Sequence, residues 1–181
     1  MPVLIDFDAY PLNVVIDLLL KDKTTKKNII WATHTYEEYR DEYSDKKQME
    51  FHQFCGIYRS IIQPRVSKAL EQQQERTKNK AEVFTPSWIC NKMNNYCDEQ
   101  WFGRKDVFNT EIENGWQTVA DKIIFPEKKN WQQYVDSRRL EITCGEAPYL
   151  VSGYDATTGE IIPLKDRTGL LDRKMRVINE N

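Results

Sequence analysis

The chain has 181 residues, of which 40% are hydrophobic and 30% charged, a composition typical of a folded globular domain and not of a disordered segment. No apolar run reaches the length of a membrane-spanning helix, and the first residues carry acidic side chains and no basic leader. The formal net charge of −2 argues against nucleic-acid binding over the whole surface but allows a local basic face. We therefore expect a cytoplasmic protein of about one domain, with no membrane partner.

The cysteines do not predict a metal site. The chain has four of them, Cys55, Cys90, Cys97 and Cys144. They are widely spaced and form no Cys-x-x-Cys pair, whereas zinc sites usually have short ligand spacings with histidines in register. Of the two histidines, only His52 lies close to a cysteine in the sequence. We interpret the cysteines as small, mostly buried thiols and expect no bound metal.

Residues 1–80 predict a mainly helical region. Within it, Asn28–Trp31 is a candidate strand. Thr35 followed by Glu38 matches a capping box, which predicts a helix beginning there. Three tyrosines would share one face of that helix, Tyr36, Tyr39 and Tyr43.

A second helix is expected over Pro64–Asn79, where basic residues outnumber acidic ones. Two interpretations remain open for this basic face. It is either a solvated helix surface or a ridge that contacts phosphate groups.

The segment Glu82–Pro86 opens the second predicted region, residues 81–181. Thr85 is a good N-cap, and Pro86 suits the first helical position because its missing N–H is not needed there. Apolar residues then recur at helical spacing until Gly103, which ends the predicted helix. They are Ile89, Met93, Tyr96 and Cys97.

Leu140–Thr143 predicts a short buried strand that runs directly into Cys144-Gly145. Beyond it, Asp155–Gly159 predicts the turn of a hairpin, and residues 167–179 predict a last helix. One face of that helix would carry Leu171, Met175 and Ile178. A strand, a glycine turn and a helix in this order indicate an α/β fold.

Two motifs carry the chemistry: Glu82-Val83-Phe84-Thr85-Pro86, and the sequence RLEITCGEAPYL at 139–150. Together and in this order they resemble the amino-terminal part of DNA adenine-N6 methyltransferases, in particular methylase subunits of restriction–modification systems. In that family the first motif is motif X and the second is motif I. The resemblance covers roughly residues 28–181, including Trp101–Gly103 and Gly169–Lys174.

The resemblance implies a Rossmann-like S-adenosylmethionine-dependent methyltransferase domain that follows a helical N-terminal region. A glycine turn after the first strand lets the backbone approach the cofactor, so Thr85 should lie within roughly 20 Å of Gly145. Glu141 would accept hydrogen bonds from the cofactor's ammonium group, and the helix that begins near Thr85 would meet its carboxylate. The cofactor-binding residues implied by the resemblance are Val83, Thr85, Glu141, Thr143, Cys144 and Gly145.

The sequence departs from the family pattern in two ways. Ala147 stands where a second glycine is usual, and the catalytic tetrapeptide [Asp/Asn/Ser]-Pro-Pro-[Tyr/Phe] is absent, since the 181 residues contain no Pro-Pro pair. No second acidic strand end for the ribose is evident, and Asp155 and Asp172 are the nearest candidates. We therefore expect an incomplete enzyme that by itself transfers no methyl group to DNA.

The implied partners are double-stranded DNA and a restriction endonuclease, a specificity subunit or a downstream half of the methylase. One alternative is a non-catalytic binding or assembly module. Another is a nuclease, in which Asp106 and the Glu-x-Lys pattern at Glu127–Lys129 would hold Mg²⁺ through their carboxylates. Trp88 and Trp101 flank the predicted motif X helix and are the first candidates for base stacking.

Overall fold

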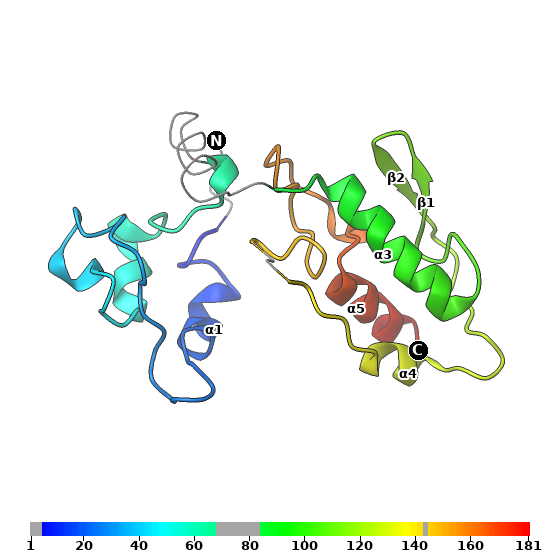
Figure 1. Cartoon of the computed structure of the whole chain (residues 1–181), viewed down its shortest axis with the longest axis horizontal. Coiled ribbons are helices and arrows are strands. Elements are labelled where there is room, and N and C mark those ends of the chain that lie inside the picture. The colour runs from blue at the N-terminus through cyan, green and yellow to red at the C-terminus, as the bar shows by residue number, and fades with distance from the viewer. Residues whose placement is uncertain (1–4, 68–83, 143–144) are drawn as a thin grey trace. The chain divides into compact units, whose positions relative to one another are not determined.

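The computed structural model describes residues 5–67, 84–142 and 145–181 (Figure 1). The chain divides into two units, Met1–Pro64 and Arg65–Asn181. The sequence placed this boundary at residues 80 and 81, within a stretch that lies outside the described residues. Each unit has its own hydrophobic core and is described separately below.

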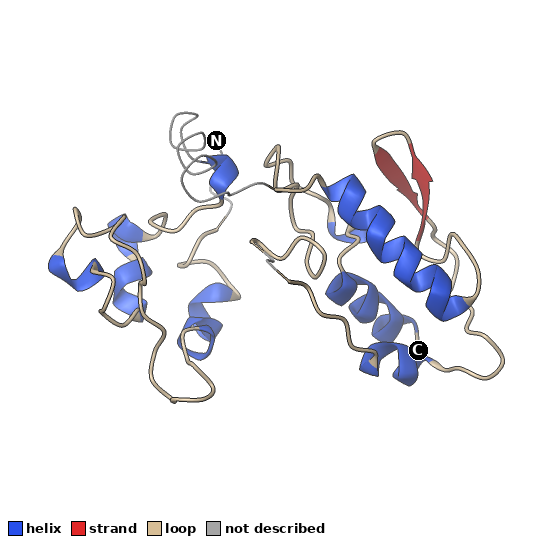
Figure 2. Cartoon of the chain, viewed as in Figure 1, coloured by secondary structure: helices blue, strands red, loops and turns tan. Residues whose placement is uncertain are grey.

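The first unit consists of one helix and several short turns of 3₁₀ helix around an aromatic core. Helix α1 spans Leu12–Leu19, and 3₁₀ turns follow at Asp41–Tyr43, Phe51–Phe54 and Gly56–Tyr58 (Figure 2). The core is formed by Phe7, Ile16, Leu20, Trp31, Tyr43 and Phe54. Trp31 stacks on Phe54 and donates its indole N–H to the buried Gln53.

The helix predicted from Thr35 is wrong. Residues 35–39 form turns, and only Asp41–Tyr43 winds into a 3₁₀ turn. Thr35 does not act as a helix cap, because its hydroxyl is paired with the Thr33 hydroxyl at 2.9 Å. The strand expected at Asn28–Trp31 is reduced to isolated bridges. Of the helix expected over Pro64–Asn79, only a 3₁₀ turn at Arg65–Ser67 is described, and residues 68–79 lie outside the described residues.

The second unit begins its described part with helix α3, Ser87–Phe102. The predicted helix is confirmed, with its N-cap at Pro86, one residue later than the sequence indicated. Gly103 ends the helix as expected, with a left-handed φ of 72° that glycine adopts without a Cβ penalty.

The buried face of α3 is polar, which reverses the predicted orientation of the helix. Met93 and Tyr96, expected in the core, are 53% and 63% exposed. The buried positions are Ser87, Cys90, Asn91, Asn94, Asp98 and Phe102. The hydrophobic periodicity was therefore present in the sequence but marks the solvent side of this helix.

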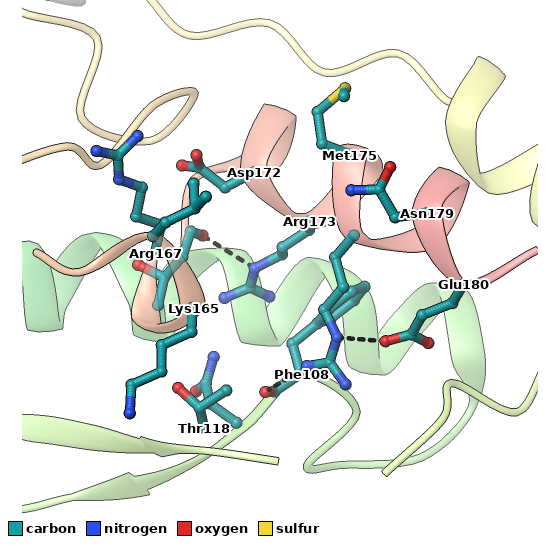
Figure 3. Close-up of a pocket in the computed structure, with 13 residues that line it drawn as sticks. Phe108, Thr118, Lys165, Arg167, Asp172, Arg173, Met175, Asn179 and Glu180 are labelled. Atoms are coloured by element: carbon teal, nitrogen blue, oxygen red, sulfur yellow. Dashed lines mark hydrogen bonds and ion pairs between the residues drawn. The ribbon is translucent and has the colours of Figure 1, made fainter. Parts of the chain in front are cut away.

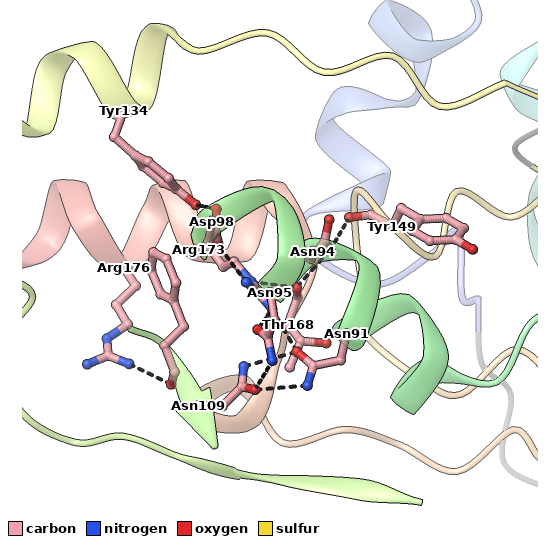
Figure 4. Close-up of polar contacts among 12 residues, drawn as sticks. Asn91, Asn94, Asn95, Asp98, Asn109, Tyr134, Tyr149, Thr168, Arg173 and Arg176 are labelled. Atoms are coloured by element: carbon pink, nitrogen blue, oxygen red, sulfur yellow. Dashed lines mark hydrogen bonds and ion pairs between the residues drawn. The ribbon is translucent and has the colours of Figure 1, made fainter. Parts of the chain in front are cut away.

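The reason is a buried arginine on helix α5, which spans Leu170–Glu180. Arg173 is 2% exposed and forms an ion pair with Asp98, which is also 2% exposed. Its Nη2 atom donates to Asn91 at 2.6 Å and to Asn95 at 2.9 Å (Figure 4). A buried charge requires such partners, so the polar face of α3 turns inward.

A hairpin and a short helix of the second unit were not predicted. A hairpin joins β1, Asn109–Ile112, to β2, Gly115–Thr118, in antiparallel register. The two-residue turn between them contains Asn114 at φ 51°, and the Asn114-Gly115 pair is a known hairpin signal. Helix α4, Trp131–Asp136, begins at Asn130, whose side chain forms a capping box with Gln133.

The buried strand predicted at Leu140–Thr143 is wrong for the residues that the structure describes. Residues 140–142 form no strand, and Leu140 and Ile142 are 84% and 74% exposed. The last helix is confirmed but also faces the other way, with Leu170, Arg173 and Val177 buried. Its predicted core face is the exposed one and consists of Leu171, Met175 and Ile178. In the described part of the chain, neither β1 nor β2 pairs with residues 140–142, so no sheet buries Leu140 and Ile142.

The fold is a mixture of helices and a small sheet, which is compatible with the expected α/β class. Across the described residues the sheet has two antiparallel strands, β1 and β2. The core of this unit lies among Phe102, Val107, Phe108, Ile123, Tyr134 and Val177. No helix in the described part of the chain has the length and apolar character to cross a membrane.

We predict that Asp98→Ala lowers the free energy of unfolding by about 3–5 kcal/mol, because it leaves the Arg173 guanidinium buried without its counter-charge. Chemical denaturation at neutral pH measures this change. Glu127→Ala is the matched control, since Glu127 is exposed, and it should change stability by less than about 0.5 kcal/mol. Equal effects of the two substitutions would contradict the role given to the ion pair.

Candidate functional site

The structure brings the two sequence motifs together. A Cβ atom built on Gly145 would lie 2.9 Å from Cε1 of Phe84, the residue before Thr85. Thr85 and Gly145 are thus well within the separation expected from the sequence. The close approach that requires a glycine here is to the Phe84 ring, and Gly145 also adopts a left-handed φ of 50°.

Glu141 belongs to the second motif, lies near Cys90 of α3, and has one carboxylate oxygen unsatisfied. The backbone N–H groups of Tyr149 and Leu150 donate to its carboxylate. Its Oε2 atom is buried and has no hydrogen-bond partner. Burial raises the pKa of Glu141, and the two backbone donors offset this only in part. A buried carboxylate oxygen without a donor costs free energy and calls for a functional explanation.

Cys90 and Tyr149 complete this cluster. The buried Cys90 thiol lies 3.8 Å from the Thr85 carbonyl oxygen, and the Tyr149 side chain interacts with both Thr85 and Cys90. Burial raises the pKa of Cys90 to about 11, and the nearby Glu141 carboxylate contributes to that rise. The thiol is therefore neutral near pH 7 and acts as a packing group, not as a nucleophile.

The N-terminus of α3 is capped by a carboxylate from a distant loop. Asp155 Oδ2 accepts the Ser87 N–H at 2.6 Å, while its Oδ1 accepts the N–H groups of Thr157 and Thr158. The expected hairpin turn at Asp155–Gly159 is present, closed by a bridge between Tyr154 and Ile161. Asp155 thus already occupies the first N–H of this helix, and the expectation that N–H groups at this helix start meet a cofactor carboxylate stays a prediction for the others.

The two acidic candidates for a ribose site have structural roles. Asp155 caps α3, and Asp172 Oδ2 accepts both the N–H and the hydroxyl of Ser152. Three of the proposed cofactor-binding residues, Val83, Thr143 and Cys144, lie outside the described residues. The others, Thr85, Glu141 and Gly145, lie in the two segments that meet at the Phe84 ring.

Sequence reasoning missed Cys90, Tyr149 and Asp155 as members of this neighbourhood. Tyr149 belongs to the second motif, so its position was available as a signal. Cys90 lies one helical turn after Pro86 and faces inward, a position that the wrong helix orientation concealed. Asp155 was expected as a turn residue and as a ribose candidate, and its role as the cap of α3 was missed because its contact with Ser87 spans 68 residues.

The alternative sites find little support among the described residues. His34, Glu37 and Asp45 are the one group there with metal-ligand spacing. They are bonded to one another, with His34 Nδ1 2.7 Å from Glu37 Oε1, and this hydrogen bond raises the pKa of His34. The nuclease residues Asp106 and Glu127 belong to no such group within that same part of the chain.

The two tryptophans chosen for base stacking differ. Trp101 packs edge-on against Tyr134 and Phe125, at the side of the core, with the Lys129 ammonium over its ring. Trp88 is half-buried at the start of α3 and lines a groove. Trp101 is therefore a packing residue, and Trp88 keeps an accessible surface.

A cavity of about 610 Å³ lies between α5 and the β1–β2 hairpin (Figure 3). Its basic side chains are Lys165, Arg167, Arg173 and Arg176. Arg173 is neutralised by Asp98, and Arg176 is paired with Glu180 at 2.7 Å. Arg167 donates to the Ile162 carbonyl oxygen. Two of these four charges are thus paired within the protein, and Asp172 and Glu180 also line the cavity, so it does not by itself indicate an anion site.

Scans of protein-family models, of curated proteins and of solved structures each gave no match to this chain.

We predict that Asp155 stabilises the fold through the α3 cap. Burial raises the pKa of Asp155, but the Thr157 hydroxyl and the Ser87 N–H lower it further, to about 2 from 3.8. Because the folded-state pKa is the lower one, this stabilisation is complete above about pH 4 and is lost as the pH falls through about 2. Asp155→Ala should cost about 1–2 kcal/mol at neutral pH.

Chemical denaturation across this pH range tests the cap. The difference between the parent and Asp155→Ala should shrink below about pH 4, whereas Asp136→Ala, at an exposed position, should differ little from the parent throughout. A difference that stays constant down to pH 2 would overturn the assignment.

We predict opposite effects for glycine and alanine at positions 145 and 147. Ala147 has a left-handed φ of 54°, which costs an L-residue about 1–2 kcal/mol. Ala147→Gly relieves this strain but increases the conformational entropy of the unfolded chain, so it should be neutral or stabilise the fold by up to about 1 kcal/mol. Gly145→Ala should destabilise by more than about 1 kcal/mol, because it adds that strain and a contact with Phe84. Thermal or chemical denaturation measures both, and the same sign for both would contradict the backbone argument.

Proposed function

We propose that this chain carries the donor-binding part of a DNA adenine-N6 methyltransferase of a restriction–modification system, with S-adenosylmethionine as cofactor and double-stranded DNA as substrate. The single observation that carries the proposal is the buried, unpartnered Oε2 of Glu141. It lies in the motif that resembles the family's motif I, in a segment that meets the motif X segment at Phe84 and Gly145.

The chemistry of this cluster suits the zwitterionic end of the cofactor. The ammonium group of the cofactor would supply the donor that Glu141 Oε2 lacks, and a charge-assisted hydrogen bond is stronger than a neutral one. The Thr85 side chain, beside the Tyr149 hydroxyl, offers a hydroxyl group to the cofactor carboxylate. When bound, S-adenosylmethionine would supply the electrophilic methyl group.

The proposal covers the donor site and not the chemistry at the base. The tetrapeptide that clamps the adenine amine in this family is not present among the 181 residues. A polypeptide that supplies it, a restriction endonuclease and a specificity subunit are the proposed protein partners. A cytoplasmic location belongs to the same proposal.

A second candidate is a non-catalytic assembly module that pairs with a methylase or nuclease subunit. The exposed apolar side chains on α5 favour it: Leu171, Met175 and Ile178 are 49%, 55% and 41% exposed. Adjacent apolar side chains on one helix face are typical of protein interaction surfaces. The two candidates differ in what they predict for Glu141.

We predict that Glu141→Gln weakens S-adenosylmethionine binding by about tenfold or more without loss of stability. Glutamine keeps an acceptor for the Tyr149 and Leu150 N–H groups but replaces Oε2 with an NH₂ group that cannot accept the ammonium. Loss of a charge-assisted hydrogen bond of about 1.5–3 kcal/mol gives that factor. Isothermal titration calorimetry measures the affinity, and chemical denaturation measures the stability.

Glu146→Gln is the matched control. It removes a carboxylate from the same turn, but Glu146 Oε2 accepts the Tyr154 hydroxyl at 2.8 Å and is already satisfied. Its affinity for the cofactor should stay within about twofold of the parent. Equal affinities of the parent and Glu141→Gln would remove Glu141 from the site, and no detectable binding by the parent would favour the assembly module.

A further inference from the structure

A groove at the start of α3 is separate from the residues proposed to bind the cofactor. It has a volume of about 600 Å³ and lies between the first turn of α3, the β1–β2 turn and residues 155–166. We name it the indole groove after its two tryptophans, Trp88 and Trp116. Neither Thr85, Glu141 nor Gly145 lines it.

The charge of the indole groove is entirely negative. Four carboxylates line it, Glu113, Asp155, Glu160 and Asp166. Its described lining contains no lysine, arginine or histidine. Glu113 and Glu160 are exposed, and Asp155 stays ionised at neutral pH because its pKa is about 2. Among the described residues the walls themselves contribute no positive side chain, and the cation beside them is the Lys92 ammonium near the Trp88 ring.

The two indole rings are positioned by contacts within the protein. Trp116 donates its indole N–H to the Asp166 carbonyl oxygen at 2.8 Å, and the Asp166 carboxylate accepts the Thr118 hydroxyl at 2.8 Å. The Trp88 ring already has a cation nearby, the Lys92 ammonium at 5.2 Å from its centroid. Indole faces attract cations and stack well on planar guanidinium groups.

The rest of the groove is aliphatic. Ile112 and Ile161, both on its walls, are 52% and 57% exposed, and Ile162 and Pro163 adjoin them. An aliphatic stem that ends in a cation matches this combination, because the stem covers the isoleucines while the charged end meets the indoles and carboxylates. The phosphate backbone of DNA does not match it, since the groove would repel it.

We propose that the indole groove binds an arginine side chain from a basic segment of a protein partner. Arginine fits better than lysine because its planar guanidinium can stack on an indole while it donates to two carboxylate oxygens. The proposal is independent of cofactor binding, since the two sets of residues do not overlap.

The test uses the whole chain and a probe of defined chemistry, the peptide acetyl-Arg-Arg-Arg-amide, followed by tryptophan fluorescence and isothermal titration calorimetry. The neutral isostere acetyl-tricitrulline-amide should not bind. Saturable binding of the arginine peptide is expected, weakened about fivefold by Glu113→Gln combined with Glu160→Gln and about threefold or more by Trp88→Leu. Both glutamates are exposed, so the double variant should fold like the parent.

The control is Glu127→Gln combined with Asp136→Asn, which changes the net charge equally at exposed positions outside the groove. It should leave the affinity within about twofold of the parent. No saturable binding up to about 1 mM peptide, or equal losses in the two double variants, would overturn the proposal. Binding of a DNA duplex that Trp88→Leu weakens would also overturn it and assign the groove to nucleic acid.

Discussion

The buried ion pair between Asp98 and Arg173 is the constraint on which the second unit depends. Both side chains are almost wholly inaccessible, and neither charge could be buried without the other. Asn91, Asn95 and the Thr168 carbonyl oxygen accept the other hydrogen bonds of the guanidinium group, and Asn109 extends the network to β1. The buried face of α3 is therefore largely polar, and Met93 and Tyr96 lie on the solvent side.

The same network holds the proposed donor site. Arg139 also pairs with Asp98, which fixes the chain two residues before Glu141. Asn94 donates to the carbonyl oxygens of Tyr149 and Thr168, so one side chain of α3 joins the motif I segment to the residues before α5 (Figure 4). Changes to this network should alter the Glu141 environment as well as stability, because Asp98 and Asn94 hold Arg139 and Tyr149, on either side of Glu141 in the chain.

Two acidic environments in this unit differ in what they lack. Glu141 is buried with one oxygen that has no donor, which suits a single ammonium group of a bound ligand. The indole groove has several carboxylates that are solvated or already bonded, and its specificity would come from ring surfaces and shape. The two proposed ligands, a small zwitterion and an arginine side chain, would therefore be recognised by different kinds of interaction.

The sequence by itself determined the local features that depend on neighbouring residues: the helix that ends at Gly103, the turn at Asp155–Gly159 and the last helix, predicted over residues 167–179 and found over 170–180. It also indicated that the two motifs meet. The Asn114-Gly115 hairpin and the Asn130 cap had readable signals that were missed. The tertiary structure alone decided which helix faces are buried, because Arg173 and Asp98 are 75 residues apart and their pairing outweighs hydrophobic periodicity. It also left Leu140–Ile142 outside any sheet, since a strand forms only where another strand offers hydrogen bonds.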